Sequence, residues 1–168
     1  MSEGTIDVRL IRRLNGYACS SRYLGLMRLA SRLGDGPIWY ILIAAVTVGE
    51  KFAGWTGVHL ALLGLCNTLI YYTLKVSLKR ARPFATHQGI RALAEPMDAY
   101  SLPSGHTMHA VAFAIAASSF YPALALVLAP FAALTAVSRV ALGLHYPSDV
   151  LLGAIIGAAT AAVSLSLV

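Results

Sequence analysis

The chain has 168 residues, of which 58% are hydrophobic and only 12% are charged, whereas about 25% are charged in a typical soluble domain. This composition argues against an ordinary soluble domain and indicates an integral-membrane protein with a single domain over residues 1–168. The net charge of +6 favours anionic lipid headgroups and an anionic substrate as partners, and nucleic acid is not expected. Cys19 and Cys66 are expected to be free thiols, and no cleaved signal peptide is expected.

Residues 5–33 are predicted to form one or two amphipathic helices that lie in the membrane interface. Six arginines interrupt this segment, so it is not expected to span the lipid. Apolar residues from Ile6 to Leu14 share one helical face opposite the arginines, and a second helix is expected after a break at Asn15-Gly16. A soluble cap that packs its apolar stripe on the rest of the protein is the alternative, and the two interpretations are compatible.

Residues 37–168 are predicted to form an all-α bundle of about five membrane spans. The apolar segments are 38–48, 58–74, 106–120, 123–142 and 150–168. The first is shorter than the roughly 20 residues that a span needs. It is therefore expected to tilt or to extend through Phe52 to Trp55, with Glu50 and Lys51 near the far interface. A sixth span arises if the N-terminal region also crosses. Residues 79–97 are predicted to be a polar loop outside the lipid.

Charged and polar residues gather in three clusters at the ends of these segments. The clusters are Lys75 with Arg82-Pro83, then Ser104-Gly105-His106, and then Ser138-Arg139 with His145 and Asp149. Because consecutive spans cross the membrane in opposite directions, all three clusters are expected at the same membrane face. Residues separated by dozens of positions would then form one site.

The cations of these clusters suit a phosphate group. Lys75 and Arg82 are seven positions apart, so they can share one face of a helical extension. An ionised Arg139 in an apolar span costs at least a few kcal/mol unless it faces a polar cavity, which indicates a function. Arginine presents a planar fork that matches phosphate oxygens. The alternative for Lys75 and Arg82 is that they snorkel to the interface. Lipid headgroups are the predicted partners of the neighbouring basic residues, Lys79, Arg80 and Arg91.

The second and third clusters each precede a predicted helix. Free N–H groups at the start of the helix after Ser104 favour an anion, and Gly105 lets the backbone approach it. His106 then projects from the first turn, while His109 is predicted to be structural. In the third cluster, Asp149 is expected to orient His145 through one imidazole nitrogen and to leave the other free as a nucleophile. The alternative for that pair is an interfacial histidine and a helix-capping aspartate.

Together, Lys75-x6-Arg82-Pro83, Pro103-Ser104-Gly105-His106 and Ser138-Arg139-x5-His145-x3-Asp149 resemble the three-part signature of the type 2 phosphatidic acid phosphatase superfamily. That family also includes bacterial acid phosphatases and vanadium haloperoxidases. The resemblance covers residues 75–149. It implies that His145 attacks phosphorus to form a phosphohistidine, that Asp149 orients His145, and that His106 protonates the leaving oxygen. It also implies that no metal or cofactor is needed and that the phosphoryl oxygens are held by Lys75, Arg82, Ser104, Gly105 and Arg139.

A site at the membrane face predicts a lipid phosphate as substrate: polyprenyl phosphate or diphosphate, phosphatidylglycerol phosphate, or phosphatidic acid. The alternatives are a vanadate-dependent haloperoxidase and a non-catalytic protein that binds or transports lipid phosphates. The protein is expected to be a multi-pass protein of the cell membrane, with membrane lipids as partners. In the five-span arrangement all basic residues except Lys51 share the side of the site, which favours the cytoplasmic face. Many bacterial relatives instead have six spans and a site that faces outward.

Overall fold

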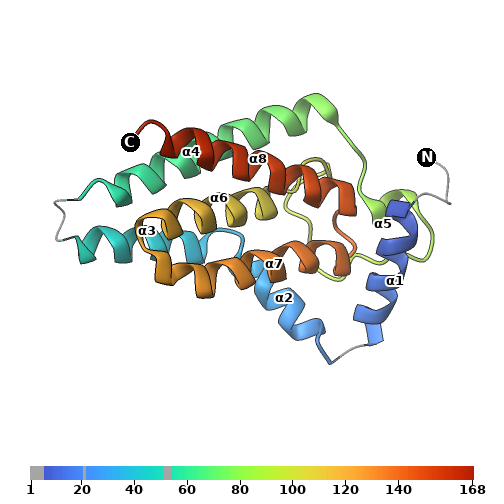
Figure 1. Cartoon of the computed structure of the whole chain (residues 1–168). Helices are drawn as coiled ribbons and strands as arrows, with labels where there is room; N and C mark the ends of the chain where they lie inside the picture. Colours follow the sequence, from blue (N-terminus) through green and yellow to red (C-terminus); the bar gives the residue numbers. More distant parts are fainter. Residues whose placement is uncertain (1–5, 21, 51–53) are drawn as a thin grey trace.

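The structure is a computed structural model that describes residues 6–20, 22–50 and 54–168. Regular secondary structure in these ranges is helical, apart from an isolated bridge between Ala81 and Tyr100. Five helices run side by side as a bundle (Figure 1). They are α3 (Pro37–Gly49), α4 (Thr56–Leu78), α6 (Gly105–Phe120), α7 (Ala125–Ala141) and α8 (Pro147–Leu165), and the 3-10 helix η1 (Pro122–Leu124) leads into α7. The predicted all-α bundle is confirmed.

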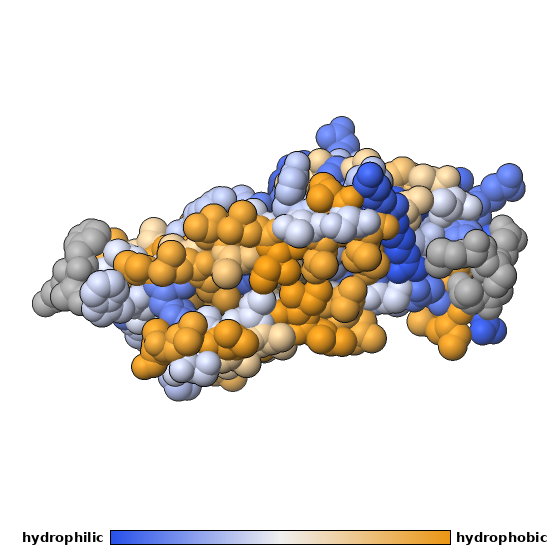
Figure 2. Space-filling model, turned by 90° about the horizontal axis from the view of Figure 1, so that it is seen from above, coloured by the Kyte–Doolittle hydropathy of each residue, from blue (hydrophilic) through white to orange (hydrophobic). Residues whose placement is uncertain are grey.

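The surface of the bundle is suited to lipid. Within the described ranges, α4, α8 and the continuous η1–α7 segment are long and apolar enough to cross a membrane, whereas α3 is apolar but has 13 residues. Large apolar side chains such as Leu62, Leu126 and Leu151 are exposed, and Figure 2 shows hydrophobic side chains over much of one face. Such continuous exposure is unfavourable in water but not in lipid. The predicted roles of Lys51 and Phe52 lie outside the described residues.

Helix α6 lies at the centre of the bundle, between α4, α7 and α8 (Figure 1). Small residues let α8 approach it closely. A Cβ atom on Gly157 would lie 2.2 Å from the carbonyl oxygen of Met108, and one on Gly153 would lie 2.6 Å from that of Ser104. The amide of Ser104 also donates to the carbonyl of Asp149 at 3.1 Å. This packing therefore sets the start of α6 against the start of α8.

Helices α1 (Ile6–Ser20), α2 (Leu24–Leu33) and α5 (Pro83–Thr86) lie at one end of the bundle (Figure 1). The predicted break at Asn15-Gly16 is wrong, because α1 continues through it. The side chain of Asn15 is buried and donates to the carbonyls of Arg91 and Ala141 at 2.9 and 3.0 Å, so tertiary bonds satisfy it inside the helix. Val8 and Ile11 are buried with it.

The outer side of α1 still carries an apolar stripe. Ile6, Leu10 and Leu14, which the sequence placed on the apolar face, are exposed. Helix α1 therefore packs one stripe on the bundle and presents another to its surroundings. The buried stripe agrees with the cap interpretation, and the exposed stripe leaves the interfacial helix a prediction.

Replacing Gly157 by alanine is expected to lower the free energy of unfolding by about 1–3 kcal/mol, as overpacked cores do. The new methyl group would meet the backbone oxygen of Met108, which cannot rotate away. Thermal unfolding in detergent measures the effect. Gly25→Ala on α2 is the matched control, because nothing lies within 4 Å of its Cβ position. Equal stability of the two variants would show that α6 and α8 are not in such close contact.

Candidate active site

The three clusters meet at the end of the bundle where α4 ends and where α6 and α8 begin. Arg82 makes the connection, because its Nη1 donates to the carbonyl of Leu144 at 2.9 Å and lies 3.3 Å from Nε2 of His145. Helix α4 ends at Leu78, so a loop carries Arg82 into the site, and the predicted helical extension is not formed. Seven of the eight predicted site residues are buried: Lys75, Arg82, Ser104, His106, Arg139, His145 and Asp149.

The contacts of His145 define which of its ring nitrogens carries the proton. Its Nδ1 lies 2.6 Å from the backbone carbonyl of Ser101, which only accepts hydrogen bonds, so Nδ1 carries the proton and Nε2 keeps its lone pair. Asp149 Oδ2 lies farther from Nδ1, at 3.7 Å, and accepts instead from the amide of Tyr146 at 2.8 Å. The Ser101 carbonyl, which sequence patterns do not reveal, is therefore the direct partner of the imidazole.

The electrostatic surroundings keep His145 neutral. Burial lowers the pKa of this imidazole well below its ordinary value, and the charges of Arg139, Arg82 and Lys75 lower it further. A neutral imidazole has a lone pair at Nε2, so the side chain can act as a nucleophile at neutral pH.

Asp98 neutralises two of the cations. Its carboxylate oxygens lie 2.6 Å from Nζ of Lys75 and 3.0 Å from Nη2 of Arg82, and Tyr71 donates to it at 2.5 Å. Burial raises the pKa of Asp98, but the bonds from Lys75 and Tyr71 and the nearby charges outweigh this and lower the pKa to about 2. Asp98 was not predicted. Its signal in the sequence is only a single acid six residues before Ser104.

The third cation, Arg139, retains capacity for an anion. Its side chain is 3% exposed, and Nη1 donates to the hydroxyl of Ser31 on α2. Within the part of the chain that the structure describes, its Nε has no hydrogen-bond partner. A buried N–H group on a cation is costly to leave unpaired, so this atom favours an incoming anion.

Arg80 supports Asp149, contrary to the prediction that it contacts headgroups. Its Nη1 lies 2.6 Å from Oδ1 of Asp149 and 2.8 Å from the hydroxyl of Ser148, and its guanidinium stacks 4.1 Å from the centre of the Tyr146 ring. Its Nη2 lies 3.3 Å from a carboxylate oxygen of Asp7 on α1. The start of α8 is thus bonded to both α1 and the loop after α4.

Three of the predicted site residues, Ser104, Gly105 and His106, lie at the start of α6. Gly105 is required there because a Cβ atom would lie 2.7 Å from the ring of Tyr71. The hydroxyl of Ser104 lies 3.0 Å from that of Thr107 and is fully buried. Nε2 of His106 lies 3.2 Å from Oδ1 of Asp35, in the turn between α2 and α3.

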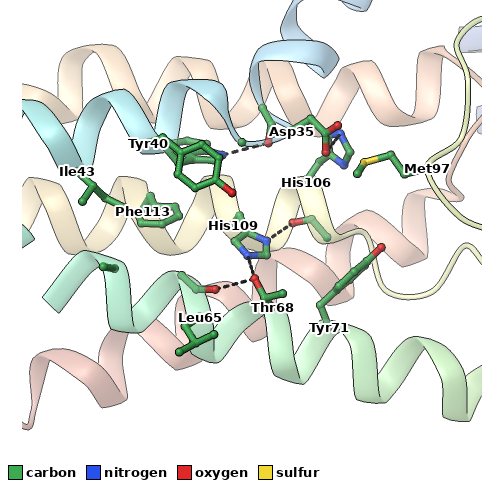
Figure 3. Close-up of a pocket in the computed structure, with 16 residues that line it drawn as sticks. Asp35, Tyr40, Ile43, Leu65, Thr68, Tyr71, Met97, His106, His109 and Phe113 are labelled. Carbon is green, nitrogen blue, oxygen red and sulfur yellow. Dashed lines mark hydrogen bonds and ion pairs between the residues drawn. The ribbon is translucent and has the colours of Figure 1, made fainter. Parts of the chain in front are cut away.

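A cavity of about 530 Å³ extends from His106 between α3, α4 and α6 (Figure 3). Gly105 and His106 are the predicted site residues that line it. Tyr71 also lines it and accepts a hydrogen bond from Lys75 at 2.9 Å, so this ring forms the wall towards the cations. Beyond His106 the lining is largely apolar and aromatic: Trp39, Tyr40, Ile43, Ala61, Leu65, Met97 and Phe113.

His109, predicted to be structural, lines this cavity with both ring nitrogens in use. Its Nδ1 lies 2.9 Å from the carbonyl of Gly105, and its Nε2 lies 3.2 Å from the hydroxyl of Thr68 (Figure 3). These bonds hold the ring against α4 and α6. In the described ranges, no three His, Cys, Asp or Glu side chains are arranged to hold a metal ion.

Residues 53–168 match the sequence profile of the PAP2 superfamily. This range covers more than half of the chain and contains all three clusters. The chain belongs to the PAP2 superfamily. The PAP2 assignment agrees with the structure, because the three clusters of the matched range meet at one end of the bundle.

Two curated proteins are similar to the chain in sequence. The chain is 32% identical to lipid A 1-phosphatase from Rhizobium johnstonii over 112 residues, which are 64% of this chain and 46% of that protein. It is 35% identical to undecaprenyl-diphosphatase BcrC from Bacillus subtilis over 100 residues, which are 60% of this chain and 48% of that protein. The chain thus spans about half the length of these relatives.

Two solved structures share the fold of this chain over nearly its whole length. LpxE from Aquifex aeolicus has a TM-score of 0.85 at 24% identity, covering 99% of this chain and 98% of that one. A transmembrane PAP2-type phosphatidylglycerolphosphate phosphatase from Bacillus subtilis has a TM-score of 0.78 at 24% identity, covering 98% of this chain and 88% of that one. The likeness shows a shared fold, and the long, exposed apolar helices of this chain support a membrane protein.

Replacing Asp98 by asparagine is expected to tighten the binding of orthovanadate, a phosphate analogue, by about tenfold. The substitution removes the carboxylate that an anion must displace from Lys75 and Arg82. The rise in unfolding temperature as orthovanadate is added measures the affinity. Glu95→Gln removes one exposed charge from the same loop and is the matched control. Weaker binding in Asp98→Asn would show instead that Asp98 organises the cations for the anion.

Proposed function

We propose that this PAP2 protein is a metal-independent phosphatase that hydrolyses a lipid phosphate through a phosphohistidine on His145. The observation that carries the proposal is a buried imidazole whose Nε2 lies 3.3 Å from Arg82, beside two further buried cations and an apolar cavity. The names of the lipid A and undecaprenyl relatives support a phosphate or diphosphate carried by a lipid.

In the first step, Nε2 of His145 attacks phosphorus while the bond from phosphorus to the leaving oxygen breaks. Lys75, Arg82 and Arg139 stabilise the charge on the phosphoryl oxygens, which is the main contribution that a protein makes to phosphoryl transfer. The phosphate takes the place of the Asp98 carboxylate on Lys75 and Arg82. Ser104 and the amide of Gly105 complete the contacts to the phosphoryl group.

His106 acts on the leaving oxygen of the bond that breaks. It gives a proton to the leaving oxygen as that oxygen takes the bonding electrons, so an alcohol leaves. In the second step a water molecule attacks the phosphohistidine, His106 accepts a proton from this water, and inorganic phosphate leaves with His145 restored. Asp149, held by Arg80, stabilises the positive charge that His145 carries between the two steps.

The cavity supports a lipid as the leaving group. It begins at His106, where the leaving oxygen would lie, and continues along apolar side chains to Ile43 and Phe113 (Figure 3). An acyl or prenyl chain fits such a lining, whereas a polar leaving group does not. The substrate classes are phosphatidylglycerol phosphate, phosphatidic acid, polyprenyl phosphate or diphosphate, and lipid A 1-phosphate. The proposed location is the cell membrane, and exposed arginines on α1 and α2 at the site end favour the cytoplasmic face.

Replacing His145 by alanine is expected to abolish phosphate release, because the variant lacks the proposed nucleophile and His106 lies on the leaving-group side. EDTA is expected to leave the wild-type rate unchanged. The assay is phosphate release by purified protein in detergent from a panel of prenyl and glycerolipid phosphates. His59→Ala is the matched control, since His59 lies near the start of α4, at the opposite end of the bundle. Substantial turnover by His145→Ala would exclude His145 as the nucleophile.

The dependence of kcat/KM on pH below neutrality tests whether His145 stays unprotonated. Its pKa in the folded protein lies below the ordinary value of 6.5, so the reactive unprotonated form persists as pH falls through 6.5. We therefore expect kcat/KM at pH 6 to stay within about twofold of its maximum. The profile is measured on one lipid phosphate with the micelle composition held constant. An acidic decline centred at or above pH 6.5 would mean that burial does not depress this pKa.

A further inference from the structure

One carboxylate lies at the head of the cavity. Of the described residues that line the cavity, Asp35 alone is acidic, and its Oδ1 lies 3.2 Å from Nε2 of His106 (Figure 3). The glycines on either side of Asp35 constrain the backbone of this turn. A Cβ atom on Gly34 would lie 2.9 Å from the side chain of Thr135, and Gly36 has a φ of 132°, which L side chains rarely adopt.

The direct charged partners of the two histidines differ in sign, although the charges of Arg139 and Lys75 also act on His106. His145 is surrounded by Lys75, Arg82 and Arg139, whose charges all act on it. His106, on the leaving-group side, meets the carboxylate of Asp35, and within the described ranges no lysine or arginine lines the cavity. On the nucleophile side, the positive charges of Lys75, Arg82 and Arg139 thus match the negative charge of a single phosphate. A second phosphate on the leaving-group side would meet a negative charge and would have no lysine or arginine partner in the cavity.

This difference separates two kinds of substrate in the proposed reaction. When a phosphate monoester reacts, the leaving oxygen takes the proton of His106 and departs as a neutral alcohol. When a diphosphate reacts at its terminal phosphorus, the leaving group is a phosphate monoester that keeps its negative charge. The two substrates therefore place different charges beside Asp35 in the transition state.

We propose that Asp35 is a specificity-determining residue that favours lipid phosphate monoesters over lipid diphosphates by placing a negative charge beside the leaving group. This inference rests on the proposed function. The side chain of Asp35 is 34% exposed. Burial raises the pKa of its carboxyl above the ordinary value, and the nearby charges of Arg139 and His109 offset only part of this. The amide of an asparagine keeps the size of the side chain and removes the charge.

The test compares farnesyl phosphate with farnesyl diphosphate, which share one chain, in the same detergent micelles at pH 7.5. Initial rates of the first phosphate released give kcat/KM for each substrate. The wild type is expected to prefer the monophosphate. In Asp35→Asn the ratio of monophosphate to diphosphate kcat/KM is expected to fall by about tenfold, mainly through faster reaction of the diphosphate.

Two variants serve as controls. Asp35→Glu keeps the charge and is expected to retain the preference, and Glu95→Gln, which removes an exposed charge outside the cavity, is expected to leave the ratio unchanged. An unchanged ratio in Asp35→Asn would overturn the inference. An equal loss on both substrates would also overturn it, because Asp35 would then only position His106. If the wild type released phosphate from neither substrate nor from phosphatidic acid, the proposed function would fail and this inference with it.

Discussion

Three cations buried at one end of an apolar bundle are the constraint around which the rest of this site is arranged. Lys75, Arg82 and Arg139 are each less than 5% exposed, and burying an ion without a partner costs several kcal/mol. The structure offsets part of this cost with the carboxylate of Asp98 and the hydroxyl of Ser31. The remaining positive potential favours a ligand with more negative charge than one carboxylate, and a phosphate group has that charge.

The same potential sets the protonation state of His145, the proposed nucleophile. Because cations and burial both disfavour a protonated His145, the imidazole keeps the lone pair that phosphorus chemistry needs. Neighbouring groups then orient the ring, with the Ser101 carbonyl at Nδ1 and the Arg82 guanidinium at Nε2. Asp149 lies farther from the ring, 3.7 Å from Nδ1, and Arg80 holds its carboxylate at the start of α8. The proposed contribution of Asp149 is to stabilise the charged phosphohistidine, whereas the Ser101 carbonyl fixes the tautomer of His145.

The close contact of α6 with α8 connects this chemistry to the membrane. Gly153 and Gly157 bring the two helices together, so the starts of both helices converge at the site. On the other side of α6, the space next to α3 and α4 stays open as the apolar cavity. The phosphate end and the lipid end of a substrate would thus meet two different surfaces that share His106. The likeness to two solved PAP2 structures over nearly the whole chain shows that this helical framework is common to them.

The sequence by itself determined the helices of the bundle and predicted which polar residues gather at one end of it. Apolar runs predicted α3, α4, α6, α7 and α8, and prolines marked the starts of α3 and α8, because these signals act within a few residues along the chain. Alternating crossings also predicted that the three clusters share one end of the bundle. The role of each predicted residue stays a prediction that the experiments above address.

Only the tertiary structure decided which atoms meet. The partners Asp98, Arg80 and Asp35 lie in loops and turns, with no periodicity that distinguishes a buried ion pair from a solvated side chain. The sequence predicts a helix break at Asn15, because asparagine by itself favours turns. In the structure, its hydrogen bonds to Arg91 and Ala141 keep it within α1. The Ser101 carbonyl that orients His145 belongs to the backbone and leaves no trace in residue type. These contacts join positions tens of residues apart, so packing of the helices, and not local preference, selects them.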